Sequence, residues 1–152
     1  MAKRRHNILI LNGPNLGQSL GIREPELYGF KDFATLVSEC EEYGESLGFG
    51  VDFRQSNHEG ELVTWIQEAR EAHAGVILNA GAYTHTSIAI LDALKMLDVP
   101  VIEVHITNIQ KREEYRRHSY VAQAATGTIS GFGGHGYILA LDALRAMLDD
   151  KE

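Results

Sequence analysis

The 152-residue sequence is poor in cysteine, in positive charge and in long apolar runs, and each shortage excludes something. The single cysteine, Cys40, excludes an internal disulfide and suits a reducing compartment. Lys plus Arg is 14 and Asp plus Glu is 21, a net charge of −7, which argues against nucleic-acid and anionic-membrane partners because phosphate binding needs excess positive charge. No apolar run approaches membrane length.

The basic start of the chain, residues 1–6, is similar to the first part of a signal peptide, but the apolar run after it lasts only from Ile8 to Leu11. We therefore expect a cytoplasmic protein with residues 1–6 as a flexible basic tail. A hydrophobic content of 44% predicts one globular catalytic domain over residues 1–152, which buries roughly two-thirds of its unfolded surface.

Short β-branched runs alternate with helical patterns along the chain. The runs predict strands at 7–11, 50–54, 75–78, 101–105 and 126–130. The helical patterns predict helices at 33–47, after 56–59, at 87–97 and at 137–148. This alternation implies a parallel sheet with helices on both faces, and five strands fit an α/β, flavodoxin-like doubly wound order 2-1-3-4-5.

Local signals predict where the helices begin and end. Asp32 is the expected N-cap of the first helix, with Gly48 as its stop. Ser56 and Glu59 have the spacing of a capping box. The third helix is expected to be capped by Thr86 or Ser87.

Ligands in such sheets bind where the strands end, near the switch point between the first and third strands. The loops after strands one, three and four should therefore converge. They carry polar residues suited to a site: Asn12, Asn15, Arg23, Tyr28, Asn79, His85, His105, Thr107 and Arg116.

The loop over residues 16–30 is long for a strand-to-helix connection and shows no periodicity. Two interpretations stay open from its residues: an active-site lid, or a solvated surface loop. Gly17 and Gly21 would let it move.

The fourth strand, 101–105, carries two polar side chains on one face, Glu103 and His105. A carboxylate placed there holds an imidazole in one tautomer and orientation. The alternative is a buried Glu–His pair whose two side chains only satisfy each other's hydrogen bonds and take no part in a site. The cationic stretch 112–120 leaves the same strand end and favours a site for a small anion.

Several common ligand sites have no support. The glycines of 131–136 match a dinucleotide fingerprint, but the chain supplies no later strand and ribose-binding acid, so we interpret them as a tight turn with close helix packing. No histidine spacing is typical of zinc, and no lysine lies in a strand context suited to a Schiff base. We expect neither metal nor cofactor.

The remaining set of Tyr, Arg, His, Glu and Asn suits proton transfer and oxyanion binding. A phenol titrates near ~10, so Tyr28 could act as a base near neutral pH only if its anion gained ~4 kcal/mol, much of which nearby Arg23 could supply. Tyr28 as base with His105 as acid would make an elimination or enolisation catalyst. The alternative for Tyr28 is an aromatic that packs on the domain.

Six stretches of the sequence match a known family. From Ile8 to Leu148 the chain resembles type II 3-dehydroquinate dehydratase. The matching stretches are 11–16 (LNGPNL), 23–29 (REPELYG), 55–62 (QSNHEGEL), 79–87 (NAGAYTHTS), 102–108 (IEVHITN) and 112–120 (REEYRRHSY). The resemblance implies a flavodoxin-like lyase that dehydrates 3-dehydroquinate to 3-dehydroshikimate, in the shikimate pathway of aromatic amino acid biosynthesis or in quinate metabolism.

The resemblance also implies roles for the catalytic residues. Tyr28 is the expected base, and Arg23 favours its anion. Asn15 holds a water against the enolate oxygen. His105 is the acid that protonates the departing hydroxyl, oriented by Glu103.

The expected substrate-binding residues are Asn79, His85, Asp92, Ile106, Thr107 and Arg116, with the backbone of Ile106 and Thr107 holding the carboxylate. By resemblance, Asp92 reaches a neighbouring subunit's site in a homo-oligomer of trimers gathered into a dodecamer. Arg112 is expected to serve as a structural ion-pairing residue. The resemblance favours the lid interpretation of 16–30.

Two rival hypotheses remain beside the dehydratase. One is a non-catalytic flavodoxin-like anion-binding or scaffold protein that keeps the pocket. The other is a different lyase or isomerase acting on a hydroxy-keto acid. Retention of Tyr28, Arg23 and His105 together argues against the scaffold.

Overall fold

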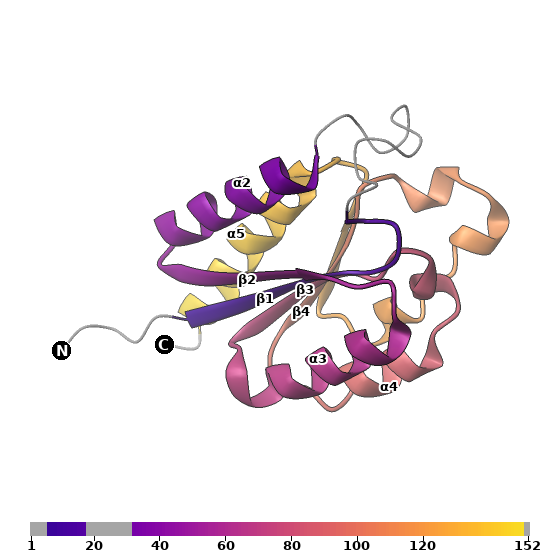
Figure 1. Cartoon of the computed structure of the whole chain (residues 1–152), viewed down its shortest axis with the longest axis horizontal. Helices are drawn as coiled ribbons and strands as arrows, with labels where there is room; N and C mark the ends of the chain where they lie inside the picture. Colours follow the sequence, from indigo (N-terminus) through magenta and orange to yellow (C-terminus); the bar gives the residue numbers. More distant parts are fainter. Residues whose placement is uncertain (1–5, 18–31, 151–152) are drawn as a thin grey trace.

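The computed structural model describes residues 6–17 and 32–150. Within these ranges one sheet lies between two layers of helices (Figure 1). The strands are β1 (His6–Asn12), β2 (Phe49–Gln55), β3 (Gly75–Asn79), β4 (Val101–His105) and β5 (Gly127–Ser130). The α-helices are α2 (Phe33–Ser46), α3 (Glu59–Ala72), α4 (Ile88–Leu94) and α5 (His135–Asp149), and short 3₁₀ turns are η1 (Gly81–His85), η2 (Ile109–Lys111), η3 (Glu114–Arg116) and η4 (Val121–Gln123).

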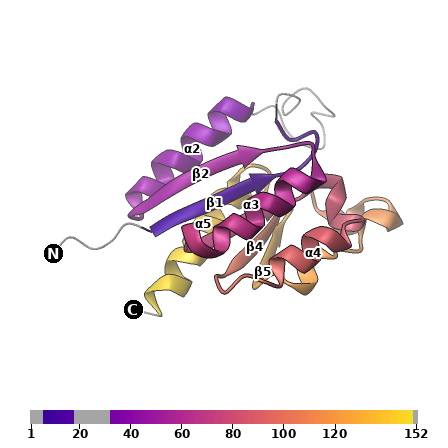
Figure 2. The ribbon, with the colours of Figure 1, turned by 60° about the horizontal axis from the view of Figure 1, so that its bottom comes forward.

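The sheet is parallel throughout, with the order β2-β1-β3-β4-β5, so the predicted flavodoxin-like doubly wound fold is confirmed. Asn12 pairs in register with Asn79, and Leu78 with Glu103. The strands therefore end at one edge, and Figure 2 shows β1 and β2 pointing the same way. Side chains that follow the strands are brought together at that edge.

Strand residues alternate between the two helical layers, as the two-residue period of a strand requires. Ile8 and Ile10 pack into one core with α2 and α5, whereas Leu9 and Leu11 pack into the other with α3 and α4. Figure 1 shows these helix pairs on opposite faces of the sheet. All four side chains are fully buried. None of the helices in the described ranges is long and apolar enough to span a bilayer.

Two of the predicted caps are confirmed. The Asp32 carboxylate accepts a hydrogen bond from the backbone N–H of Thr35 at 2.8 Å, and Ser87 rather than Thr86 caps α4 by accepting from Ile90 N–H at 2.9 Å. Helix α4, which follows its N-cap Ser87, is shorter than the predicted helix 87–97. It ends at Leu94, because the N–H groups of Met96 and Leu97 donate to carbonyls three positions back instead of four.

The predicted capping box is wrong. Helix α3 begins at Glu59 after His58, whose side chain makes no capping hydrogen bond. Ser56 is still held by the end of β2, where its N–H donates to Asn12 O at 3.0 Å, so its hydroxyl accepts only from the N–H of His58, at 2.9 Å. The serine closes a local turn two residues too early to cap the helix.

The glycines of 131–136 form the predicted tight turn. Gly131 and Gly133 have φ angles of +96° and +60°, in the left-handed region that glycine favours. At Gly136 a Cβ would lie 3.3 Å from Val104 Cγ1, so glycine lets the start of α5 approach β4 closely.

Candidate active site

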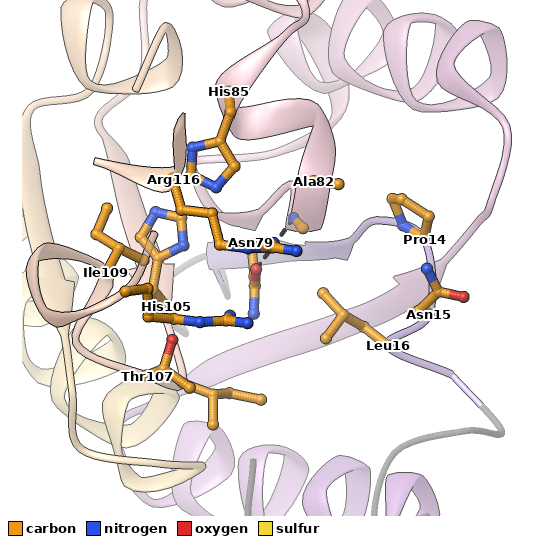
Figure 3. A pocket seen from close by; sticks show the side chains of 13 residues that line it. Pro14, Asn15, Leu16, Asn79, Ala82, His85, His105, Thr107, Ile109 and Arg116 are labelled. Atoms are coloured by element: carbon orange, nitrogen blue, oxygen red, sulfur yellow. Dashed lines mark hydrogen bonds between the residues drawn. The ribbon is translucent and has the colours of Figure 1, made fainter. Parts of the chain in front are cut away.

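A pocket opens where β1, β3 and β4 end, with a volume of about 470 Å³ including its mouth. Figure 3 shows Pro14, Asn15 and Leu16 on one side, His85, His105, Thr107 and Arg116 on the other, and Asn79 between them. The full lining is Pro14, Asn15, Leu16, Asn79, Gly81, Ala82, His85, His105, Ile106, Thr107, Ile109, Arg112 and Arg116.

The loop after β1 reaches the pocket through a close backbone contact. Gly13 N–H donates to Asn79 O at 2.8 Å, and a Cβ on Gly13 would lie only 2.2 Å from Ala80 O. Any larger residue would push this loop away from the end of β3. Asn15 then takes the left-handed conformation, φ +66°, which asparagine tolerates better than most residues. Its N–H donates to Asn57 Oδ1 at 3.2 Å.

His85 is the last residue of η1, and its Nδ1 lies 2.8 Å from the carbonyl of His118. Because a carbonyl only accepts, Nδ1 carries the hydrogen. Burial is the main cause that lowers the pKa of His85, and nearby Arg116 adds to the lowering, whereas the hydrogen bond to His118 and the carboxylate of Glu103 oppose it. The imidazole is therefore neutral near pH 7, with Nε2 as a hydrogen-bond acceptor.

Glu103 and His105 project from the same face of β4, as predicted, and both are nearly buried. His105 Nε2 lies 2.5 Å from Glu103 Oε2, and Ser119 Oγ donates to the same oxygen at 2.7 Å. The serine is in turn held by the backbone N–H of Ala122, which donates to its Oγ at 3.0 Å. The imidazole that lines the pocket thus rests on a carboxylate that is itself fixed.

Two arginines supply positive charge to the pocket wall. Arg116 Nε lies 3.0 Å from Glu113 Oε2, at ion-pair distance but without the alignment of a hydrogen bond, and Arg112 Nε lies 3.7 Å from the same oxygen. Arg112 was expected to be structural only, yet it also lines the pocket. The β4–β5 ladder ends at His105 paired with Ser130, so the N–H groups of Ile106 and Thr107 lie beyond it. This wall suits a small anion.

The structure brings seven of the predicted site residues to one pocket: Asn15, Asn79, His85, His105, Ile106, Thr107 and Arg116. Glu103 lies directly behind His105. Asp92 is exposed on α4 and does not line the pocket. The predicted base Tyr28 and its partner Arg23 lie outside the described residues, as do most of the predicted lid and residues 1–5 of the predicted tail.

Two residues that hold the site in place were not predicted from the sequence. Ser119 supports Glu103 from 16 residues away, and the Tyr137 hydroxyl joins Asn12 and Asn79 across gaps of 125 and 58 residues. Neither residue carries a local signal, because each acts through a distant partner. Among the described residues no three His, Cys, Asp or Glu side chains are grouped closely enough to hold a metal ion.

The chain is similar to several known proteins. A 3-dehydroquinate dehydratase from Mesorhizobium japonicum is 56% identical over 142 residues, covering 93% of this chain and 98% of that protein. 3-Dehydroquinate dehydratase 2 from Pseudomonas aeruginosa is 50% identical over 135 residues, which cover 89% of this chain and 90% of that protein. The crystal structure of type II dehydroquinase from Propionibacterium acnes superposes with a TM-score of 0.89 at 48% sequence identity. The match covers 93% of this chain and 97% of that one.

The family described as dehydroquinase class II matches residues 6–145, which is nearly the whole of the described chain. The match includes β1 to β5 and every residue that lines the pocket. The chain belongs to the class II dehydroquinase family.

Proposed function

We propose that this protein is a lyase that removes water from 3-dehydroquinate to give 3-dehydroshikimate. Family membership supports the reaction, and one structural observation supports it at this site. The buried Glu103–His105 pair opens into a pocket whose wall carries Arg112 and Arg116. An acid group beside a cationic wall suits a small hydroxy-keto acid that must lose a hydroxyl.

Substrate binding follows from the polarity of the lining. The N–H groups of Ile106 and Thr107, with the guanidinium of Arg116, would hold the carboxylate. Neutral His85 would accept a hydrogen bond from a substrate hydroxyl through Nε2. The amide of Asn79 would bind another polar group of the ring.

The chemistry needs one base and one acid. Tyr28, as phenolate favoured by Arg23, would remove the proton beside the ketone, leaving an enolate whose oxygen meets a water held by Asn15. Protonated His105 would then donate to the departing hydroxyl, so that the C–O bond breaks, water leaves and the conjugated enone forms. Glu103 would hold the imidazole in place for that transfer.

An assay on 3-dehydroquinate tests the proposal. The product is a conjugated enone, so turnover should appear as rising ultraviolet absorbance that depends on enzyme concentration. Absence of turnover by the folded, assembled protein would contradict the proposed function.

Neither an imine nor a metal is expected in the mechanism. No lysine lines the described pocket, and imine formation requires an amine. Borohydride added with the substrate should therefore not inactivate the enzyme, and incubation with a chelator should leave the rate unchanged. Loss of activity under either treatment would overturn the proposed acid–base route.

We also propose that the active unit is a homo-oligomer in which Asp92 serves a neighbouring subunit. Asp92 is exposed on α4, and Ile88, one helical turn before it on the same face, is 55% exposed. Met96, just beyond this helix, is 49% exposed. A carboxylate bordered by exposed apolar side chains is typical of a covered surface.

Sedimentation is expected to show a particle of several subunits, with twelve as the proposed number. Asp92→Ala should raise KM while leaving kcat nearly unchanged, because the carboxylate would contribute to binding rather than to proton transfer. Glu71→Ala, an exposed carboxylate at the end of α3, is a matched control that should alter neither constant. A fully active monomer would contradict both the assembly and the shared site.

A further inference from the structure

We infer that Tyr137 is a positioning residue, whose buried hydroxyl fixes the direction in which the Asn79 amide faces the pocket. The inference rests on the proposed function, since it assigns a source of substrate recognition within the same site. Tyr137 does not line the pocket itself. It would act only through Asn79.

The hydroxyl of Tyr137 lies between two asparagines at the ends of neighbouring strands. It donates to Asn12 Oδ1 at 2.5 Å and accepts from Asn79 Nδ2 at 3.0 Å. The residue lies on α5 and is fully buried, with its ring centroid 6.0 Å from that of Phe53. Asn12 and Asn79 are 1% and 3% exposed, so water does not replace these bonds.

These hydrogen bonds form a series from Arg54 to Gly81, and the groups at its two ends determine which atom donates in each bond. At one end Asn12 Nδ2 donates to the carbonyl of Arg54 at 3.2 Å, and a carbonyl only accepts. At the other end Asn79 Oδ1 accepts from the N–H of Gly81 at 3.2 Å, and an N–H only donates. Asn12 must therefore present Oδ1 to the phenol, and the phenol must donate to it.

The phenol oxygen is then left as an acceptor, and only the Nδ2 of Asn79 can satisfy it. Burial raises the pKa of Tyr137, so its proton stays in place across the pH range of an assay. One hydrogen of Asn79 Nδ2 is used by Tyr137, which leaves the second as a donor beside the pocket. If the Asn79 amide were flipped, its Oδ1 would face the Tyr137 oxygen and its Nδ2 would face the N–H of Gly81, so neither contact would be a hydrogen bond.

This arrangement predicts a specific kinetic effect. Tyr137→Phe keeps the ring and removes the acceptor for Asn79, so the amide loses one of its two anchors. KM for 3-dehydroquinate should rise about tenfold, the size expected for one misplaced hydrogen bond, while kcat changes by less than about threefold. Asn12→Ala leaves the ring in place but removes the group that directs the phenol proton, and should change KM in the same direction.

The matched control is Tyr43→Phe. Its hydroxyl also donates to a side chain of α5, Asp142 Oδ1 at 2.5 Å, but at the surface and away from the pocket. This variant should leave KM unchanged. In an Asn79→Ala background, Tyr137→Phe should add little to the rise in KM, because the group through which it acts is gone.

A second measurement does not depend on activity. In protein labelled with ¹⁵N at asparagine, the side-chain amide signals of Asn79 should shift in Tyr137→Phe and stay in place in Tyr43→Phe. If the wild type turns over substrate and Tyr137→Phe keeps a normal KM, or if its effect adds fully to that of Asn79→Ala, the positioning role is overturned. If the wild type shows no turnover but the amide signals shift as expected, the hydrogen-bond relay stands and the proposed function fails.

Discussion

Replacing Tyr28 with phenylalanine is expected to lower kcat by a factor of about 10² to 10⁴, the range typical for loss of a general base. The ring remains, so KM should change little, and the loss should appear in kcat and in kcat/KM alike. Steady-state kinetics on 3-dehydroquinate measure both constants. Tyr43→Phe removes a hydroxyl remote from the pocket and should retain full activity.

If Tyr28 is the base, the pH dependence of kcat/KM should also change when Arg23 is replaced. Without the guanidinium of Arg23 the phenolate is less favoured, so Arg23→Ala should move the rising limb of the kcat/KM profile to higher pH. A Tyr28→Phe enzyme with near-normal kcat would assign the base to another group.

The second large loss of activity is expected when His105, the proposed acid, is replaced. His105→Ala should lower kcat by about 10² to 10⁴, because the hydroxyl would have to leave without a proton donor. Glu103→Ala should also lower kcat, since the carboxylate orients the imidazole through a 2.5 Å contact. Once His105 is gone, adding Glu103→Ala should cost little more, because the carboxylate would act only through the imidazole.

This chain offers a matched control for that pair. His73 Nε2 lies 3.0 Å from Asp52 Oδ2, and His73 precedes β3 at the opposite edge of the sheet. His73→Ala breaks a comparable histidine–carboxylate contact, so it should lower thermal stability while leaving kcat unchanged. Full additivity of the Glu103 and His105 substitutions would give Glu103 a separate role.

The sequence predicted most of the fold because its signals were local. Most strands are short apolar runs closed by turn residues, and Asp32 and Ser87 cap their helices as their positions suggest. The Glu103–His105 pair was predictable for the same reason, since two residues along a strand share a face. The fold then brought the strand ends together at one edge.

The errors arose where tertiary contacts overrode a local signal. Ser56 has capping-box spacing, but the β-sheet holds its backbone at the end of β2. The partnerships of Ser119 and Tyr137 depend on how α5 and the segment after η3 pack against the sheet, which no spacing along the chain encodes. A single sequence therefore indicated the groups that face the pocket better than those that hold them in place.

The interior position of β1 has a consequence for how the chain folds during synthesis. On the ribosome β1 can pair with β2 as soon as residues 49–55 emerge, but its other edge must wait for residues 75–79. Until then a strand that is apolar on both faces, Ile8 to Leu11, has an open edge and is at risk of pairing with another nascent chain. Because β1 also carries the loop with Asn15, the pocket cannot close before β3 and β4 have joined the sheet. A nascent chain in which β3 and β4 have not yet joined the sheet therefore has no formed pocket, and a chaperone that shields this edge would protect yield rather than speed catalysis.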